Sequence, residues 1–121
     1  MLVIKKEQMS TLGNRVFSRR MRSILNQSFS ESLEILPDVL DEIILELIEQ
    51  AAQYQLTLET EVAPFVICAW LFGVPFDTNF PAVREVLEDA AMSGEEKAEF
   101  LWNFAEFGME ILEESELDVS Q

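Results

Sequence analysis

The chain has 121 residues, 49% of them hydrophobic, and a formal net charge of −15 at pH 7. This length and apolar content fit one globular domain with one core, and they exclude a disordered chain. The acidity argues against nucleic acid and anionic membranes as partners, because both require neutralisation by Lys and Arg, and it is compatible with a basic protein partner.

The charges divide the chain into a basic beginning and an acidic remainder. Residues 1–30 hold six basic side chains and one acid, whereas residues 31–121 hold two basic side chains and 22 acids. Self-repulsion of this size weakens folding. The acidic remainder is therefore a candidate surface for contact with a partner.

A first helix is predicted from about Lys5 to Asn26. Apolar residues recur along one side of it at helical spacing, namely Met9, Leu12, Val16, Phe17 and Ile24. Three arginines spaced i, i+4 and i+7 form a basic stripe on another side, namely Arg15, Arg19 and Arg22. Two interpretations are open: the stripe docks on the chain's own acidic helices, or it contacts an acidic surface of a partner.

A second helix is predicted from Asp38 to about Tyr54, after a serine-rich break at residues 28–32. Its inward face is apolar and comprises Leu40, Ile43, Ile44, Leu47, Ile48 and Ala51. The opposite side carries the acids Asp38, Glu42, Glu46 and Glu49. This acidic face is either simply solvated or a surface that binds a partner.

The segment 60–73 is apolar on nearly all sides, which is typical of a central helix buried over most of its surface. Thr60 is its expected N-cap, and Pro64 is expected to be tolerated within its first turn. Gly73 is expected to end the helix. The sequence therefore places this segment at the middle of the fold.

An aromatic loop over residues 74–81 and a short helix from about Ala82 to Ala91 are predicted next. The aromatic side chains of the loop either pack onto the core or contact a partner. The short helix should turn four residues inward, namely Val83, Val86, Leu87 and Ala90.

The last helix has the clearest start signal in the chain. Ser93 and Glu96, three residues apart, match a capping box, and the helix should run to about Glu114. One apolar stripe on it comprises Phe100, Phe104, Phe107 and Ile111. Trp102 and Met109 lie away from that stripe, so they form either a contact for a partner or a surface covered by the first helix. A polar, frayed tail is expected from about residue 115.

These elements predict an all-α fold for residues 1–121, a single-domain bundle of about five helices around the central apolar helix. No alternating run longer than a few residues is present, so no sheet is expected.

The chemistry of the side chains predicts that the protein is not an enzyme. The chain has no histidine, which removes the commonest general base, the commonest metal ligand and the Ser–His and Cys–His nucleophile pairs. One thiol, Cys68, cannot form a zinc site or an internal disulfide, and the four glycines are too scattered for a phosphate-binding loop. We therefore expect no cofactor, no metal and a location in a reducing cytoplasm.

Five segments carry a resemblance to a known family: Ile4–Met9, Phe17–Met21, Ile48–Thr57, Glu61–Ala63 and Leu71–Asp77. Together they resemble small bacterial proteins encoded beside type VI secretion spike and effector genes. This chain has Pro81-Ala82 where the family has Pro-Trp, so we expect a different loop contact there. The resemblance implies a bacterial cytoplasm and a role beside a secreted toxin or its loading machinery, and it assigns no catalytic residue.

Two functions are expected from these observations. The first is a non-catalytic accessory protein, an adaptor or co-chaperone, that binds a secretion effector or its chaperone. The alternative is an acidic immunity protein that masks the active site of a cognate toxin. The candidate contact residues are Trp102, Met109, Asp38, Glu42, Glu46, Glu49, Arg15, Arg19 and Arg22. Self-association through the second apolar side of the last helix is a further possibility.

Overall fold

The computed structural model describes residues 11–119, with side chains described for residues 13–111. Over that range every regular element is helical and no strand occurs, which confirms the all-α class and the single bundle. The elements are α2 (Thr11–Ser28), the 3-10 helix η1 (Ser30–Glu34), α3 (Pro37–Gln53), α4 (Glu59–Phe72), α5 (Phe76–Asn79), α6 (Pro81–Leu87) and α7 (Gly94–Val119). Residues 11–119 thus contain six α-helices, one more than expected, because a single turn, α5, forms within the predicted aromatic loop.

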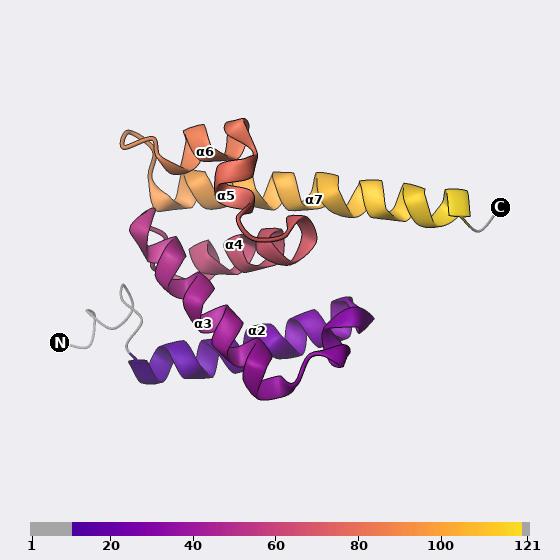
Figure 1. The fold of residues 1–121 in the computed structure, drawn as a ribbon. Helices are drawn as coiled ribbons and strands as arrows, with labels where there is room; N and C mark the ends of the chain where they lie inside the picture. The colour runs from indigo at the N-terminus through magenta and orange to yellow at the C-terminus, as the bar shows by residue number, and fades with distance from the viewer. Residues whose placement is uncertain (1–10, 120–121) are drawn as a thin grey trace.

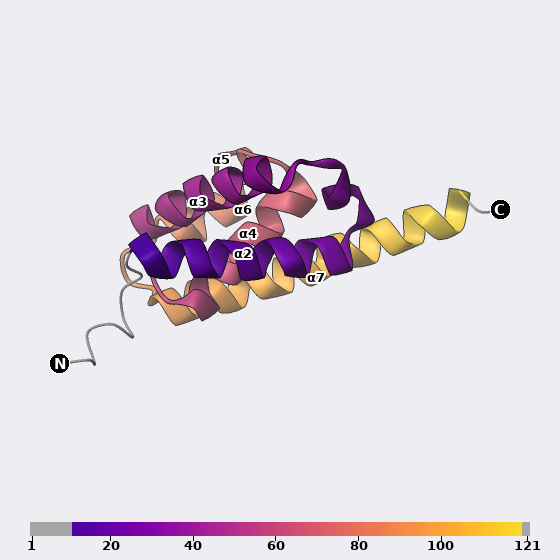
Figure 2. The ribbon, with the colours of Figure 1, turned by 90° about the horizontal axis from the view of Figure 1, so that it is seen from below.

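Helix α4 lies at the centre of the bundle, with α5, α6 and α7 on one side and α2 and α3 on the other (Figure 1). Seen from below, α2 runs along the bundle with α3 beside it, and in both views the last turns of α7 extend beyond the other helices (Figure 2). The prediction of a central apolar helix is confirmed by the buried residues of α4, which are Val62, Pro64, Phe65, Val66, Ile67, Cys68 and Ala69.

The start of α4 differs from the prediction, because Thr60 is not its N-cap. The helix begins at Glu59, and the Glu61 carboxylate Oε1 accepts the main-chain N–H groups of Thr57 and Leu58 at 3.1 and 3.2 Å. Pro64 is the sixth residue of the helix, so it lies beyond the first turn. A carboxylate that reaches back to the preceding backbone has replaced the expected hydroxyl cap.

The buried side of α2 is rotated from the one predicted. Phe17, Met21 and Leu25 form the buried stripe, whereas Val16 and Ile24 are 45% and 44% exposed. The spacing i, i+4, i+8 places the three buried residues on one face, and Val16 and Ile24 lie one position before two of them, at the edge of that face. The predicted start at Lys5, Met9 and the side chain of Leu12 lie outside the described residues.

The apolar face of α3 is confirmed at five positions, namely Leu40, Ile44, Leu47, Ile48 and Ala51. Ile43 is 38% exposed and does not belong to the core, contrary to the prediction. Helix α6 is shorter than predicted and ends at Leu87, so Ala90 is exposed rather than inward.

Aromatic rings join α4, the α5–α6 segment and α7. The ring of Phe72 lies 4.6 Å from that of Phe104 and 5.4 Å from that of Phe80, measured between centroids. Phe76 is buried and packs edge-on against Phe65, with centroids 5.0 Å apart. These rings pack against the core, which is one of the two roles that the sequence allowed for the aromatic loop.

The capping box at the start of α7 is confirmed. The main-chain N–H of Glu96 donates to Ser93 Oγ at 3.1 Å, and the main-chain N–H of Ser93 donates to Glu96 Oε1 at 2.9 Å. The helix runs to Val119, so the backbone from residue 115 to 119 is helical and not a frayed tail as predicted.

The face that α7 buries lies between the two apolar sides that the sequence indicated. Its centre consists of Leu101, Ala105 and Gly108. Phe100 and Phe104 are partly buried on one flank, and Met109 is partly buried on the other. Phe107 and Ile111, which were assigned to the apolar stripe, are 56% and 44% exposed. Phe107 is exposed although its neighbour Gly108 is buried, because consecutive residues of a helix point in different directions.

Candidate protein-binding groove

The basic stripe of α2 lies against the acids at the start of α3. A polar crevice of about 330 Å³ between the two helices is lined by Arg15, Ser18, Arg19, Asp38, Asp41 and Glu42. Next to it, Arg22 Nε lies 3.2 Å from Asp41 Oδ1. The two groups form an ion pair, but their relative orientation does not allow a hydrogen bond. Four of the candidate contact residues therefore face one another within the chain: Arg15, Arg19, Asp38 and Glu42.

A second ion pair joins the basic helix to the central helix. Arg20 Nη2 lies 2.6 Å from both carboxylate oxygens of Glu59, the first residue of α4. Arg20 lies outside the predicted basic stripe. Within the stripe, Arg22 forms an ion pair with an acid of the chain, whereas Arg15 and Arg19 line the crevice without an ion pair to any described side chain. The interpretation that the stripe docks on the chain's own acids is therefore supported at Arg22.

The remaining acids of the predicted α3 face have different surroundings. Glu46 and Glu49 are exposed and do not line the crevice. Glu49 lies instead at the edge of a separate pocket next to α2 and α4. The acidic face of residues 38–49 is therefore not one uniform surface.

The structure separates the other predicted pair of contact residues, Trp102 and Met109. Met109 packs against the core and is partly buried, which fits a structural role. Trp102 remains 40% exposed. Of the two side chains, only Trp102 presents a large apolar surface at a groove.

That groove lies between the start of α4 and the first half of α7 and has a volume of about 700 Å³. Its walls are formed by Leu58, Thr60, Glu61, Glu95, Glu96, Ala98, Glu99, Trp102 and Asn103. Glu95, Glu99 and Trp102 are spaced i, i+4 and i+7, so α7 projects all three from one side. This spacing was the sequence signal for the groove, and the prediction named Trp102 but not the two acids on the same side of α7.

The carboxylates of the groove differ in what they already contact. Glu61 and Glu96 accept main-chain N–H groups at the starts of α4 and α7. Glu95 and Glu99 form no ion pair with any residue whose side chain the structure describes. The basic residue closest in sequence, Lys97, points elsewhere: it is 2% exposed, and its Nζ donates to the main-chain oxygen of Tyr54 at 3.1 Å. The groove is therefore anionic with one aromatic wall.

A buried polar connection, which the sequence did not reveal, joins α3, α5 and α7. The Tyr54 hydroxyl donates to Asp77 Oδ2 at 2.6 Å, while the main-chain oxygen of Tyr54 accepts from Lys97. Burial, followed by the hydrogen bond to Asp77, raises the pKa of Tyr54 to about 12. These contacts hold the end of α3 against its neighbours, with Lys97 acting as a cationic cap at the carboxyl end of the helix.

The single thiol lies in the contact between α4 and α7. Cys68 is buried, and its Sγ donates to the main-chain oxygen of Leu101 at 3.3 Å. Burial raises the pKa of the Cys68 thiol to about 12, so the thiolate that a nucleophile requires is disfavoured. Within the described part of the chain, no group of three potential ligands is placed to hold a metal ion.

Comparisons with protein-family models, with curated proteins and with solved structures find no match to this chain. None of the helices in residues 11–119 combines the length and apolar character needed to cross a membrane.

Proposed function

We propose that this protein is a non-catalytic accessory factor, an adaptor or co-chaperone, that binds an effector of a bacterial type VI secretion system or the chaperone of that effector. The observation that carries the proposal is the groove in which the half-exposed Trp102 lies beside Glu95 and Glu99. The secretion setting rests on the resemblance of the sequence segments to proteins encoded beside such effectors.

The groove supports this function through ordinary interface physics. Tryptophan is among the residues that contribute most to binding energy at the centre of an interface. The carboxylates beside it attract a basic partner and orient it, and an arginine of the partner can stack on the indole ring. Since Glu95 and Glu99 have no ion pair among the described side chains, a partner can use them without breaking an internal contact.

The alternative is an immunity protein that covers a toxin's active site. Its support is the exposure of Glu46 and Glu49, which lie outside the crevice occupied by the arginines of α2. In this case binding would depend on α3 and would abolish the toxin's activity.

The first experiment is affinity purification of the tagged protein from its native bacterium, with mass spectrometry of the chains that co-elute. We expect an effector, its chaperone or a spike protein. Recovery of the protein alone would contradict both functions. The recovered partner is then titrated against the Trp102→Ala variant, for which we expect at least a tenfold loss of affinity, about 1.4 kcal/mol.

A matched control is Phe107→Ala, which removes another exposed aromatic side chain of α7 outside the groove. The groove is supported if the Trp102 variant loses affinity and the Phe107 variant does not. If affinity instead falls with Glu46→Lys and Glu49→Lys, and the bound partner loses its enzymatic activity, the immunity function replaces the accessory one.

A further inference from the structure

In the described part of the chain, one side of α3 presents apolar side chains to solvent. Leu36 lies just before the helix, and Val39 and Ile43 follow it at i+3 and i+7, so the three residues share one side. Each of them is between 38% and 71% exposed. These three residues are called the α3 stripe below.

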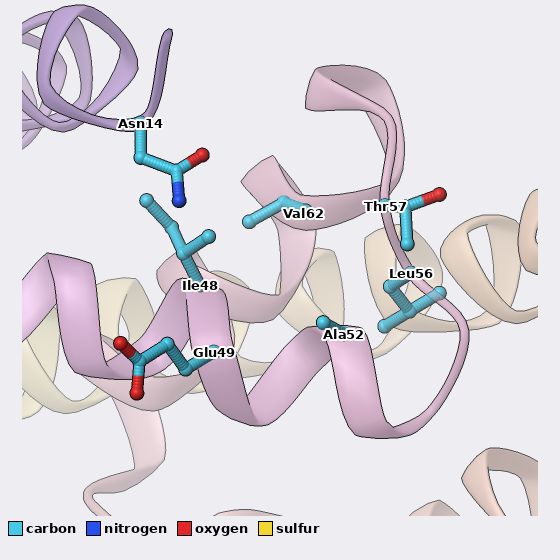
Figure 3. Close-up of a pocket in the computed structure, with 7 residues that line it drawn as sticks. All are labelled: Asn14, Ile48, Glu49, Ala52, Leu56, Thr57 and Val62. Carbon is cyan, nitrogen blue, oxygen red and sulfur yellow. The ribbon is translucent and has the colours of Figure 1, made fainter. Parts of the chain in front are cut away.

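The core side of the same helix shows the contrast. There Ile48 points toward Val62 of α4, and both side chains are buried (Figure 3). Helix α3 is thus apolar on two sides, of which the core side is covered by its neighbours. A single exposed aliphatic residue is ordinary, whereas several on one face mark a contact with another molecule.

The α3 stripe continues onto the end of α4. Ile43 and Val74 are the exposed members of a small recess between the two helices, and Trp70, which is partly buried, also lines it. Phe29 supports Trp70, with the two ring centroids 6.1 Å apart. The exposed apolar surface therefore has two rows, one from α3 and one from the end of α4, between which another helix can pack.

The charges near the α3 stripe are of one sign. Residues 23–83 contain ten acids and no Lys or Arg. Glu46 follows Ile43 at i+3, on the same side of α3, and it is exposed. It has no ion pair among the described side chains and lies outside the crevice of the α2 arginines. Its charge is therefore available to a cation of a partner.

We propose that the α3 stripe binds an amphipathic helix of a partner protein, and that this helix carries Lys or Arg beside its apolar side. The apolar side of the partner helix packs on Leu36, Val39 and Ile43, with Val74 as the second wall. A basic residue of the partner helix pairs with the Glu46 carboxylate.

The spacing of the surface favours a helix. Residues 36, 39, 43 and 46 are separated by steps of three and four, which is the spacing with which one helix packs along another. A docked amphipathic helix is also a common mode of peptide recognition by apolar grooves.

Electrostatics disfavours a second copy of this chain as the occupant. Two α3 stripes packed in parallel would place Glu46 against Glu46, and in antiparallel they would place Glu46 against Leu36. Each copy also has a formal net charge of −15. A basic partner helix removes both conflicts.

The α3 stripe is separate from the Trp102 groove, since none of its residues lines the groove. The proposal therefore goes beyond the accessory function and does not depend on the secretion setting. Its test uses no natural partner, so failure of the accessory function leaves the test unaffected.

The test is a fluorescence titration of the full chain carrying Trp102→Phe, in which Trp70 is the one remaining tryptophan. The probe is a capped peptide of three Leu-Lys-Ala-Ile-Lys-Ala-Ala repeats, which has Leu and Ile at steps of three and four and Lys beside them. We expect a saturable change of the Trp70 emission, because Trp70 lines the recess next to Ile43.

Two further peptides test the chemistry of the partner. One has the same composition in an order that gives no apolar side, and the other has Glu in place of Lys. Each should bind at least tenfold more weakly than the probe. An unchanged Trp70 emission with the probe, or equal binding of any two of the three peptides that include the probe, would overturn the proposal.

A pair of matched variants locates the binding site. Leu36→Ser combined with Val39→Ser changes two exposed side chains, so the core stays intact and binding should weaken at least tenfold. The control is Val16→Ser combined with Ile24→Ser, which changes two aliphatic residues of similar exposure on α2 and should leave binding unchanged. An equal loss in both variants would show that the peptide does not recognise the α3 stripe.

Glu46→Gln tests the ion pair. It should weaken binding of the probe at low salt and have little effect at high salt, where the pair is screened. Binding that is unaffected at low salt would contradict the role of Glu46. Sedimentation equilibrium of the full chain tests the other occupant: a dimer that dissociates on Leu36→Ser with Val39→Ser would show that a second copy covers the stripe and would overturn the proposal.

Discussion

The acids of α3 and the acids of α7 differ in what lies next to them. At the start of α3, Asp38, Asp41 and Glu42 face the arginines of α2 across a shared crevice. Along the first half of α7, Glu95 and Glu99 have no ion pair with a described side chain and lie beside an exposed tryptophan. Two acidic surfaces that look alike in the sequence therefore have different neighbours, arginines of the same chain in one case and an exposed tryptophan in the other.

The two halves of the bundle are also packed differently. The contact between α4 and α7 is made by buried apolar side chains and aromatic rings, with small residues of α7 at its centre. The contact between α2 and α3 adds charged groups at its outer edge. The following changes test this contrast, from the largest expected effect to the smallest.

The first change is Gly108→Ala, which disturbs the close contact of α7 with α4. A Cβ at position 108 would lie 2.5 Å from Phe72 Cζ, and the ring is held on its other sides by Phe80 and Phe104. We expect the free energy of unfolding to fall by about 1–3 kcal/mol, measured by urea denaturation. Glu106→Ala is the control, because it places an alanine at an exposed position of the same helix. Without a steric conflict, replacing glycine by alanine inside a helix raises stability by about 1 kcal/mol. Unchanged or higher stability of Gly108→Ala would therefore contradict the close contact.

The second change is alkaline pH, which tests the buried thiol between α4 and α7. The pKa of Cys68 is raised from 9.0 to about 12 in the folded chain, so the unfolded chain loses this proton first. The contribution of Cys68 to stability is therefore complete below pH 9.0 and is lost as the pH rises toward 12. The limiting slope is about 1.4 kcal/mol per pH unit.

Urea denaturation at several alkaline pH values measures this slope, and Cys68→Ser supplies the comparison because its hydroxyl does not titrate there. The variant should show a smaller decrease of stability between pH 9 and 10. Above pH 10.0 the raised pKa of Tyr54 adds a second decrease of the same sign in both proteins. Identical slopes for the two proteins below pH 10 would rule out a buried, neutral thiol.

The third change is Asp41→Asn, which removes the ion pair with Arg22 from the edge of the α2–α3 contact. Both side chains are partly buried, at 27% and 19% exposure, so we expect a loss of about 1 kcal/mol that becomes smaller at high salt. Glu46→Gln is the control on the same helix, because Glu46 lies outside the crevice. An equal effect of the two substitutions would show that the crevice does not use the acids of α3.

The fourth change is Glu95→Gln together with Glu99→Gln on α7. Stability should remain within a few tenths of a kcal/mol, with a rise if any, because neutralising two acids reduces the self-repulsion of the chain. Affinity for the purified partner should fall, and mainly through a slower association rate. A loss of stability of about 1 kcal/mol or more would show that these acids serve the fold and not a partner.

Much of the architecture was predictable because its signals are local. The capping box of Ser93 and Glu96 uses two residues three positions apart, so it could be recognised without any tertiary contact. The central helix was recognisable because a segment that is apolar on all sides has no polar face to expose to water and must be buried. The start of α4 was missed because Glu61 caps it from inside the helix, while the more familiar signal pointed to Thr60.

Other features could not be predicted because they depend on neighbours distant in sequence. Helix α2 has apolar residues on two adjoining sides, and only the position of α3 and α4 decides that Met21 is buried and Ile24 is not. The same holds for α7, where Met109 is covered and Phe107 is left exposed.

The sequence by itself determined the all-α class, the central place of the apolar helix and the division into a basic first helix and an acidic remainder. These follow from the periodicity of apolar residues and from a count of charges, both of which are properties of the chain alone. Only the tertiary structure decided which acids are matched by the arginines of α2 and which remain beside Trp102. The physical reason is that a charge acts on whatever lies within a few ångströms, and helix packing, not position in the sequence, sets those distances.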